Sequence, residues 1–130
     1  IALVAGSRKS EIESLLPLFL RAVQIFLQKK PAVRFTLLRA DSISQDFIIS
    51  VAREHKLEAV LDHVDIISNG DKNIEKIQSC CLALTKPGTS TLELALLGLP
   101  AVVVFKTSWL SYLLARPLVK VAWMSLPNLL

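Results

Sequence analysis

Short apolar segments alternate with longer amphipathic segments along the whole chain. The apolar segments carry few charges, as expected of strands that are buried on both faces of a sheet. In the amphipathic segments, apolar residues recur with the period of an α-helix. This alternation predicts an α/β fold: a doubly wound parallel sheet with helices on both faces, joined by right-handed crossovers. We expect strands at residues 1–5, 34–39, 64–67, 82–84 and 101–105.

Residues that begin or end helices stand between these predicted strands. Ser10 and Glu13 have the spacing of a capping box for a first helix, which Pro31 ends and Pro17 interrupts. Further helices are expected over 43–56 (capped by Asp41 and Ser42), 73–79, 89–98 and 108–115, followed by an extended apolar segment over 121–130.

The chain has 130 residues, which is enough for one domain. It begins with Ile1 rather than Met and finishes on an apolar run, Leu126 to Leu130, so we expect it to be part of a longer protein. No stretch approaches the about 20 apolar residues that a membrane-spanning helix needs. Because the chain opens on a predicted strand, we expect neither a secretory signal peptide nor export.

The formal net charge of +4 comes from scattered Lys and Arg residues. This charge favours an anionic ligand or an anionic membrane surface over nucleic acid. Cys80 and Cys81 are adjacent, and the chain has no second pair to complete a zinc site or a disulfide framework, so we expect reduced thiols and no metal. His55 and His63 have no partner at ligand spacing and are expected on the surface.

The segment Gly6-Ser7-Arg8 follows the first predicted strand and precedes a helix. Gly6 would let the backbone approach a ligand, the N–H groups at the helix start favour a phosphate, and a guanidinium can grip two phosphate oxygens. Taken alone, these residues fit a plain strand-to-helix turn with a solvated Arg8 slightly better. They match neither the dinucleotide-binding fingerprint nor the P-loop pattern.

A second loop, Lys86 to Glu93, follows the predicted strand at 82–84. Gly88 and three consecutive hydroxyl residues would offer donors to a phosphate, with Lys86 as a counter-charge and Glu93 placed for ribose hydroxyls. Ser90 and Glu93 also have capping-box spacing, which explains those two residues without a ligand. Three hydroxyl residues exceed what a cap needs, so we favour a functional loop; they are Thr89, Ser90 and Thr91.

Open parallel sheets bind ligands at the carboxyl ends of their strands, where both loops are expected. Together the two loops predict a nucleotide diphosphate held between two helix N-termini.

A third feature, near the end of the chain, mixes aromatic and basic residues with apolar ones. It suits a membrane interface and, equally, a core helix with snorkelling cations. Its residues are Trp109, Tyr112, Arg116, Lys120 and Trp123.

Four segments resemble segments of lipid-A-disaccharide synthases, and the similarity covers essentially the whole chain. Residues 1–12 resemble the opening of that family's second domain, and residues 82–93 resemble its central motif. Residues 118–121 and 125–130 resemble later motifs. The sequence Ser-Leu-Pro-Asn-Leu after a preceding Leu-Val-Lys makes the resemblance specific.

The resemblance implies a GT-B glycosyltransferase of family 19 with two Rossmann-like domains. Residues 1–130 would form most of the C-terminal, donor-binding domain, truncated at its C-terminal end. The family transfers diacylglucosamine from UDP-2,3-diacylglucosamine to 2,3-diacylglucosamine 1-phosphate (lipid X), and releases UDP and a β-1,6-linked precursor of lipid A. It needs no metal or cofactor and works at the cytoplasmic face of the inner membrane of Gram-negative bacteria.

The partners implied are the UDP-sugar donor, the lipid-linked acceptor sugar phosphate, the membrane surface and an N-terminal acceptor domain that is absent from the chain. The fragment alone is therefore expected to be inactive.

The resemblance also assigns roles to residues: Arg8 would hold the diphosphate of UDP, supported by Gly6 and Ser7. Asn128 matches a position that is important for activity. The implied nucleotide-site residues are Gly88, Thr89, Ser90, Thr91 and, for the ribose, Glu93.

Two positions depart from the family pattern. Cys81 stands where Asp is frequent, and Pro87 stands where a small residue such as Ser is common. Pro87 removes one backbone donor beside the predicted phosphate loop.

Two other functions stay open: another GT-B-like UDP-sugar enzyme, such as a muramyl-pathway transferase or a UDP-sugar 2-epimerase, and a non-catalytic doubly wound binding or regulatory domain.

Overall fold

The computed structural model describes residues 1–68 and 71–106. Within them, five parallel strands form one sheet in the order β3-β2-β1-β4-β5. This confirms the predicted parallel α/β fold, and β1 lies at the centre of the sheet. The chain builds the sheet outward from β1 to β3, then returns to the other side of β1. The strands are β1 (Ala2–Val4), β2 (Phe35–Arg39), β3 (Val64–Ser68), β4 (Ala83–Thr85) and β5 (Ala101–Val103).

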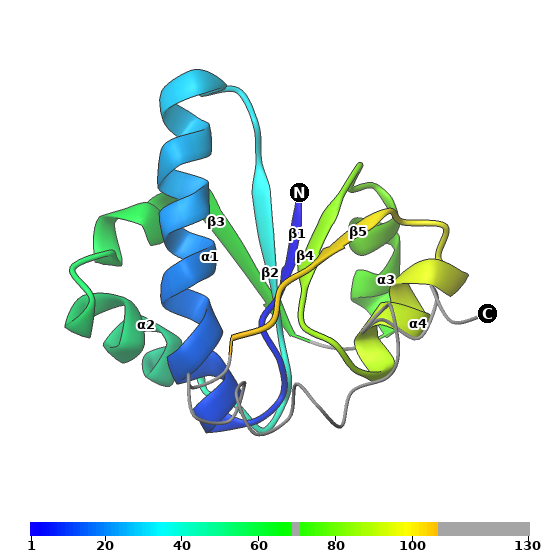
Figure 1. The fold of residues 1–130 in the computed structure, drawn as a ribbon, viewed down its shortest axis with the longest axis horizontal. Coiled ribbons are helices and arrows are strands. Elements are labelled where there is room, and N and C mark those ends of the chain that lie inside the picture. The colour runs from blue at the N-terminus through cyan, green and yellow to red at the C-terminus, as the bar shows by residue number, and fades with distance from the viewer. Residues whose placement is uncertain (69–70, 107–130) are drawn as a thin grey trace, which may run out of the picture.

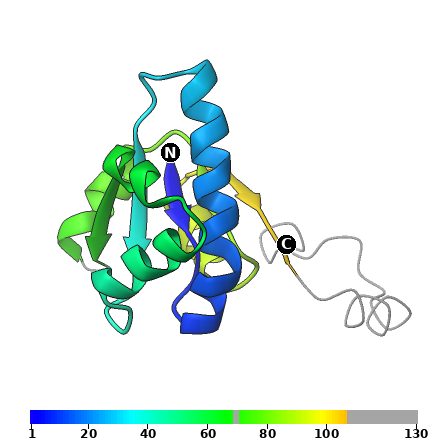
Figure 2. The same cartoon turned by 90° about the vertical axis from the view of Figure 1, so that its left-hand side faces the viewer.

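Helices cover both faces of the sheet (Figure 1). One face carries α1 (Lys9–Lys29) and α2 (Gln45–Glu54), which stand in front of the strands in the turned view of Figure 2. The other face carries α3 (Asp71–Gln78) and α4 (Thr89–Leu96). A 3-10 helix, η1 (Glu58–His63), joins α2 to β3 and lies in a segment for which the sequence predicted no helix.

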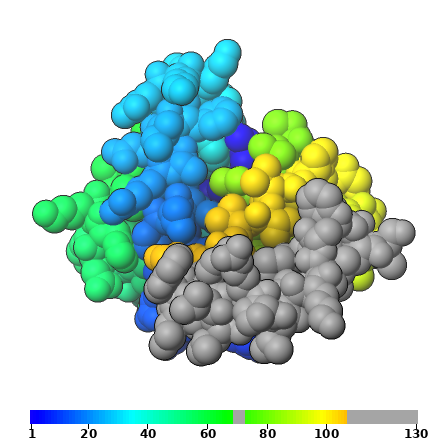
Figure 3. All heavy atoms as spheres, in the orientation of Figure 1, coloured from blue at the N-terminus to red at the C-terminus, as the bar shows by residue number. Residues whose placement is uncertain are grey.

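The larger core lies between α1 and the sheet. Ile12, Leu16 and Phe19 are at most 2% exposed, and they pack with strand residues such as Leu3 and Leu37. In the space-filling view, α1 occupies the centre of this face and β5 borders it (Figure 3). A smaller core on the other face joins α3 and α4 to the sheet. Its buried residues are Ala2, Val4, Ile67, Ile77, Ala83, Leu94 and Leu99.

Pro17 lies inside α1, which nevertheless runs unbroken from Lys9 to Lys29. A proline within a helix leaves one carbonyl without its partner and crowds the preceding turn. Pro17 is itself buried against the core, so packing outweighs this local cost. The predicted end of the helix is confirmed, since Lys30 forms the C-cap.

The predicted helix starts were less accurate. α1 begins at Lys9 with Arg8 as the N-cap residue, so the expected Ser10–Glu13 capping box is wrong. α2 begins at Gln45, where the Ser44 hydroxyl accepts a hydrogen bond from the Phe47 amide at 3.2 Å. Asp41 and Ser42 therefore do not cap it.

The capping box expected at Ser90 and Glu93 is also wrong. α4 begins at Thr89 with Gly88 as the N-cap, and no side chain caps it. The Ser90 hydroxyl instead pairs with the Thr85 hydroxyl at 3.1 Å. A glycine cap leaves the first amides of the helix without a side-chain acceptor.

The helix predicted over 108–115, the extended segment over 121–130 and the aromatic and basic residues from Trp109 to Trp123 lie outside the described residues. In the part of the chain that is described, no helix is long and apolar enough to cross a membrane.

Candidate functional site

The two predicted ligand loops lie next to each other at the carboxyl edge of the sheet. β1 and β4 are paired in register, with Val4 opposite Thr85, so the loops that leave them begin side by side. Strand order reverses at this point, because β2 and β3 lie on one side of β1 and β4 and β5 lie on the other. Such a switch point is where open α/β sheets bind ligands.

The first loop is shaped around the carboxylate of Glu11. Glu11 Oε2 accepts hydrogen bonds from the amides of Ser7 and Arg8, at 3.0 and 3.2 Å. Gly6 has φ of +123°, and a Cβ at this position would lie 2.3 Å from Glu11 Oε2. The requirement for glycine thus comes from a close approach within the protein. The amides of Ser7 and Arg8 are therefore already bonded within the protein and are not free for a phosphate.

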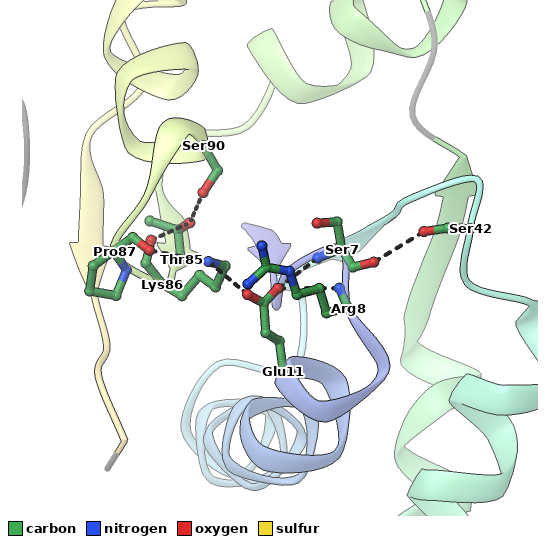
Figure 4. Close-up of polar contacts among 8 residues, drawn as sticks. All are labelled: Ser7, Arg8, Glu11, Ser42, Thr85, Lys86, Pro87 and Ser90. Atoms are coloured by element: carbon green, nitrogen blue, oxygen red, sulfur yellow. Dashed lines mark hydrogen bonds and ion pairs between the residues drawn. The ribbon is translucent and has the colours of Figure 1, made fainter. Parts of the chain in front are cut away.

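Ser7 and Arg8 are exposed at the end of this loop. The Ser42 hydroxyl donates to the carbonyl of Ser7 at 3.0 Å and so holds the loop from the β2 side. The side chain of Arg8 extends in the direction of Lys86 in the close-up of Figure 4. Among the described residues, no carboxylate forms an ion pair with Arg8. Its guanidinium is therefore available to an anion.

Lys86 links the two loops. Its ammonium pairs with Glu11 Oε1 at 3.1 Å and donates to the Pro87 carbonyl at 3.2 Å (Figure 4). Both side chains are largely covered, with 25% of Lys86 and 19% of Glu11 exposed. Burial acts to raise the pKa of Glu11, but the hydrogen bonds from Lys86, Ser7 and Arg8 and the charge of Lys86 outweigh it and lower the pKa below 4.5. Glu11 is therefore ionised at neutral pH.

The second loop presents its hydroxyl groups unequally. Thr89 is exposed, and Ser90 is half-buried with its hydroxyl close to that of Thr85. Thr91 is 2% exposed, and its hydroxyl donates to the Gly88 carbonyl at 2.6 Å. The Thr91 side chain thus shapes the turn and is not presented to a ligand. Gly88, with φ of +150°, gives the turn its sharp entry into α4.

Glu93 is exposed and lines a cavity of about 400 Å³ between α3 and α4. Val4 and Leu38 contribute from the sheet, and Ser90 contributes from the start of α4. The other lining residues described are Asn73, Ile74, Ile77, Leu94, Leu96 and Leu97. The cavity is mainly apolar with a few polar groups, which is typical of sites for small organic ligands.

The remaining predicted residues are away from this site or undescribed. Asn128 lies outside the described residues, so its position is a prediction only. His55 and His63 are exposed, as expected, and both cysteines are free thiols. Within residues 1–68 and 71–106, no group of three or more His, Cys, Asp or Glu side chains has the geometry of a metal site.

Sequence reasoning missed Glu11, which contacts both loops. A carboxylate at the third position of a helix is a known signal, because it can accept hydrogen bonds from the N-cap backbone. The signal was hidden by placing the helix start too late. Ser42 was predicted as a helix cap, and its contact with Ser7 joins segments 35 residues apart in the sequence.

A family model described as lipid-A-disaccharide synthetase matches residues 1–130. Curated relatives called lipid-A-disaccharide synthase include those of Anaeromyxobacter sp. strain K, 40% identical over all of this chain, and Acinetobacter baylyi, 35% identical over all of it. The relative from Geobacter sulfurreducens is 30% identical over 99% of the chain. The chain covers 32%, 34% and 32% of these relatives, or about a third of their length.

Proposed function

The chain belongs to the lipid-A-disaccharide synthetase family, and from this premise we propose that it is the donor-binding domain of a glycosyltransferase that makes the lipid A disaccharide. The proposed donor is UDP-2,3-diacylglucosamine and the acceptor is 2,3-diacylglucosamine 1-phosphate. Transfer forms a β-1,6 linkage and releases UDP. An N-terminal domain outside this chain is proposed to bind the acceptor and to supply the base that activates its hydroxyl.

The observation that carries this proposal is that Arg8 extends toward Lys86, on the loop that leads into α4, at the switch point of the sheet. Negative charge builds on the diphosphate as UDP leaves. A guanidinium and the amides of Thr89 and Ser90 at a helix start can stabilise that charge without a metal. The amides of Ser7 and Arg8 are not counted among these donors, because Glu11 already accepts from both.

The nucleoside is proposed to lie toward α4. Glu93 would accept hydrogen bonds from the ribose hydroxyls at the cavity that it lines with Ser90. Gly6 and Ser7 would support the diphosphate through the shape of their loop. Asn128 is proposed to contribute to activity, on the strength of the sequence resemblance alone.

Both substrates are lipids with charged head groups, so the enzyme is proposed to act as a peripheral protein on the cytoplasmic face of the inner membrane. The scattered positive charge of the chain, +4 in total, supports contact with an anionic surface.

A comparison of donors tests the function. The full-length enzyme is mixed with the lipid acceptor and with either UDP-2,3-diacylglucosamine or UDP-N-acetylglucosamine, and both UDP and disaccharide are measured. We expect a disaccharide from the acylated donor only. Turnover of the soluble donor in its place would assign the chain to another GT-B-like UDP-sugar enzyme. If neither donor reacts or binds, the proposed glycosyltransferase activity is wrong.

A further inference from the structure

The glycines of the two loops each lie close to a charged side chain. A Cβ at Gly6 would lie 2.3 Å from Glu11 Oε2, and a Cβ at Gly88 would lie 3.3 Å from Lys86 Nζ. Both residues have positive φ, at +123° and +150°. The backbone of each loop therefore passes close to one partner of the same ion pair.

The ion pair uses most of the bonding capacity of its two groups. Glu11 receives three hydrogen bonds, two from its own loop and one from Lys86. Lys86 places two of its three donor protons, on Glu11 and on the Pro87 carbonyl. Both groups thus hold the two loops to each other and leave little capacity for a ligand.

We propose that Glu11 and Lys86, here called the Glu11–Lys86 bridge, are positioning residues that fix the spacing between the loop at Gly6–Arg8 and the loop at Gly88–Ser90. The inference rests on the proposed function, because the spacing matters for a diphosphate that spans both loops. It reassigns Lys86 from a counter-charge of the ligand to a structural link. Arg8 then supplies the cation that meets the diphosphate.

Electrostatics favour a bridge over a ligand role for Lys86. To give a phosphate more than its one remaining donor proton while keeping the Pro87 carbonyl, Lys86 would have to leave Glu11. The carboxylate would then remain, largely covered and ionised, close to a second anion. Like charges at short range in a partly buried site repel each other strongly. With the bridge intact, the three side chains Arg8, Glu11 and Lys86 carry charges of +1, −1 and +1, so the site keeps a net positive charge.

A double-mutant cycle on UDP affinity tests the bridge. The variants are Glu11→Gln, Lys86→Met and the double variant, each in the full-length enzyme, with UDP binding measured by calorimetry. A Gln oxygen can still accept from the Ser7 and Arg8 amides, so the loop keeps its cap. We expect each single variant to weaken UDP binding about 10-fold, as for loss of a largely covered, charge-assisted hydrogen bond. The double variant should be no weaker than the worse single variant by more than about twofold.

A direct ligand role for Lys86 predicts a different pattern. Glu11→Gln would then free Lys86 for the phosphate and tighten UDP binding, while Lys86→Met would weaken it. That pattern, or multiplied effects in the double variant, would overturn the bridge. So would single variants that bind UDP as the wild type does. If the wild type itself does not bind UDP, the proposed function is wrong, and the bridge proposal, which rests on it, is wrong as well.

A second measurement does not depend on how Glu11→Gln folds. Hydrogen exchange at the amides of Ser7 and Arg8 is measured in ligand-free wild type and in Lys86→Met. The bridge predicts faster exchange in the variant, because its Glu11 carboxylate loses its anchor on the other loop. Unchanged exchange would show that Lys86 does not hold the loop and would overturn the proposal. The matched control is Arg53→Met, which removes an exposed ion pair with Glu58 at 2.7 Å and should change neither exchange nor UDP affinity.

Discussion

At the scale of single residues, Arg8 is the group on which the proposed chemistry depends. Its guanidinium is exposed and has no ion-pair partner among the described carboxylates. Arg8→Ala in the full-length enzyme should lower kcat/KM by about 10²–10³-fold, as loss of a preorganised group at a developing charge typically does. Initial rates with the acylated donor provide the measurement. A loss of only a few-fold would exclude Arg8 as the diphosphate clamp.

Gly6 gives a prediction about stability at the same scale. Gly6→Ala forces a side chain into φ of +123° and into contact with Glu11 Oε2. Gly98→Ala provides the control, because Gly98 also has positive φ, +70°, but a Cβ there meets nothing within 4 Å. The control should cost about 1–2 kcal/mol from the backbone alone, and Gly6→Ala should cost about 2 kcal/mol more, through its less accessible φ and through the displaced carboxylate. Urea unfolding measures both, and equal costs would refute the close packing of Gly6 on Glu11.

At the scale of helices and strands, the cap of α2 is the clearest test of the observed boundaries. Ser44→Ala removes the hydroxyl that accepts from the Phe47 amide, and should lower the free energy of unfolding by about 1 kcal/mol. Asp41→Ala changes an exposed residue that the sequence had suggested as the cap, and should have an effect within about 0.5 kcal/mol. Thermal or urea unfolding measures both losses of stability. A larger loss in Asp41→Ala than in Ser44→Ala would place the helix start at Asp41.

The elements themselves could be predicted because burial leaves a periodic pattern. The α1 stripe through Ile12, Leu16 and Phe19 is buried as expected, and so are Ile48 and Val51 of α2. Helix starts were harder to predict, because several Ser, Thr and Asp residues compete at each one and only the local backbone selects among them. η1 was missed because a 3-10 helix has little amphipathic periodicity of its own.

The loops of the site were predictable only in part. Glycine and hydroxyl residues after apolar strands indicate where ligands can approach, and β1 and β4 do bring both loops together. The sequence does not indicate which polar groups the protein uses for itself. The bonds from Ser7 to Glu11, from Lys86 to Glu11 and from Thr91 to the Gly88 carbonyl depend on side-chain directions in three dimensions.

At the scale of the whole molecule, the two faces of the sheet have different roles. α1 and α2 bury the larger core on one face, whereas α3 and α4 enclose the cavity of about 400 Å³ on the other. The ligand edge lies where these two halves meet, at the ends of β1 and β4. A stable core can therefore support loops whose residues are chosen for binding.

The same division predicts how the chain behaves by itself. It covers about a third of the length of its relatives, and the acceptor site is proposed to lie in another domain. Holding two substrates together can contribute effective molarities of about 10⁵–10⁸ M, which a donor domain alone cannot supply. We expect the 130-residue chain to bind UDP but to form no disaccharide from the acylated donor and acceptor, while the full-length enzyme forms it under the same conditions. Chromatography of the lipid products and calorimetry with UDP measure the two activities separately. Disaccharide formation by the chain alone would show that these residues contain the acceptor site and base as well, because proximity would then be provided within one domain.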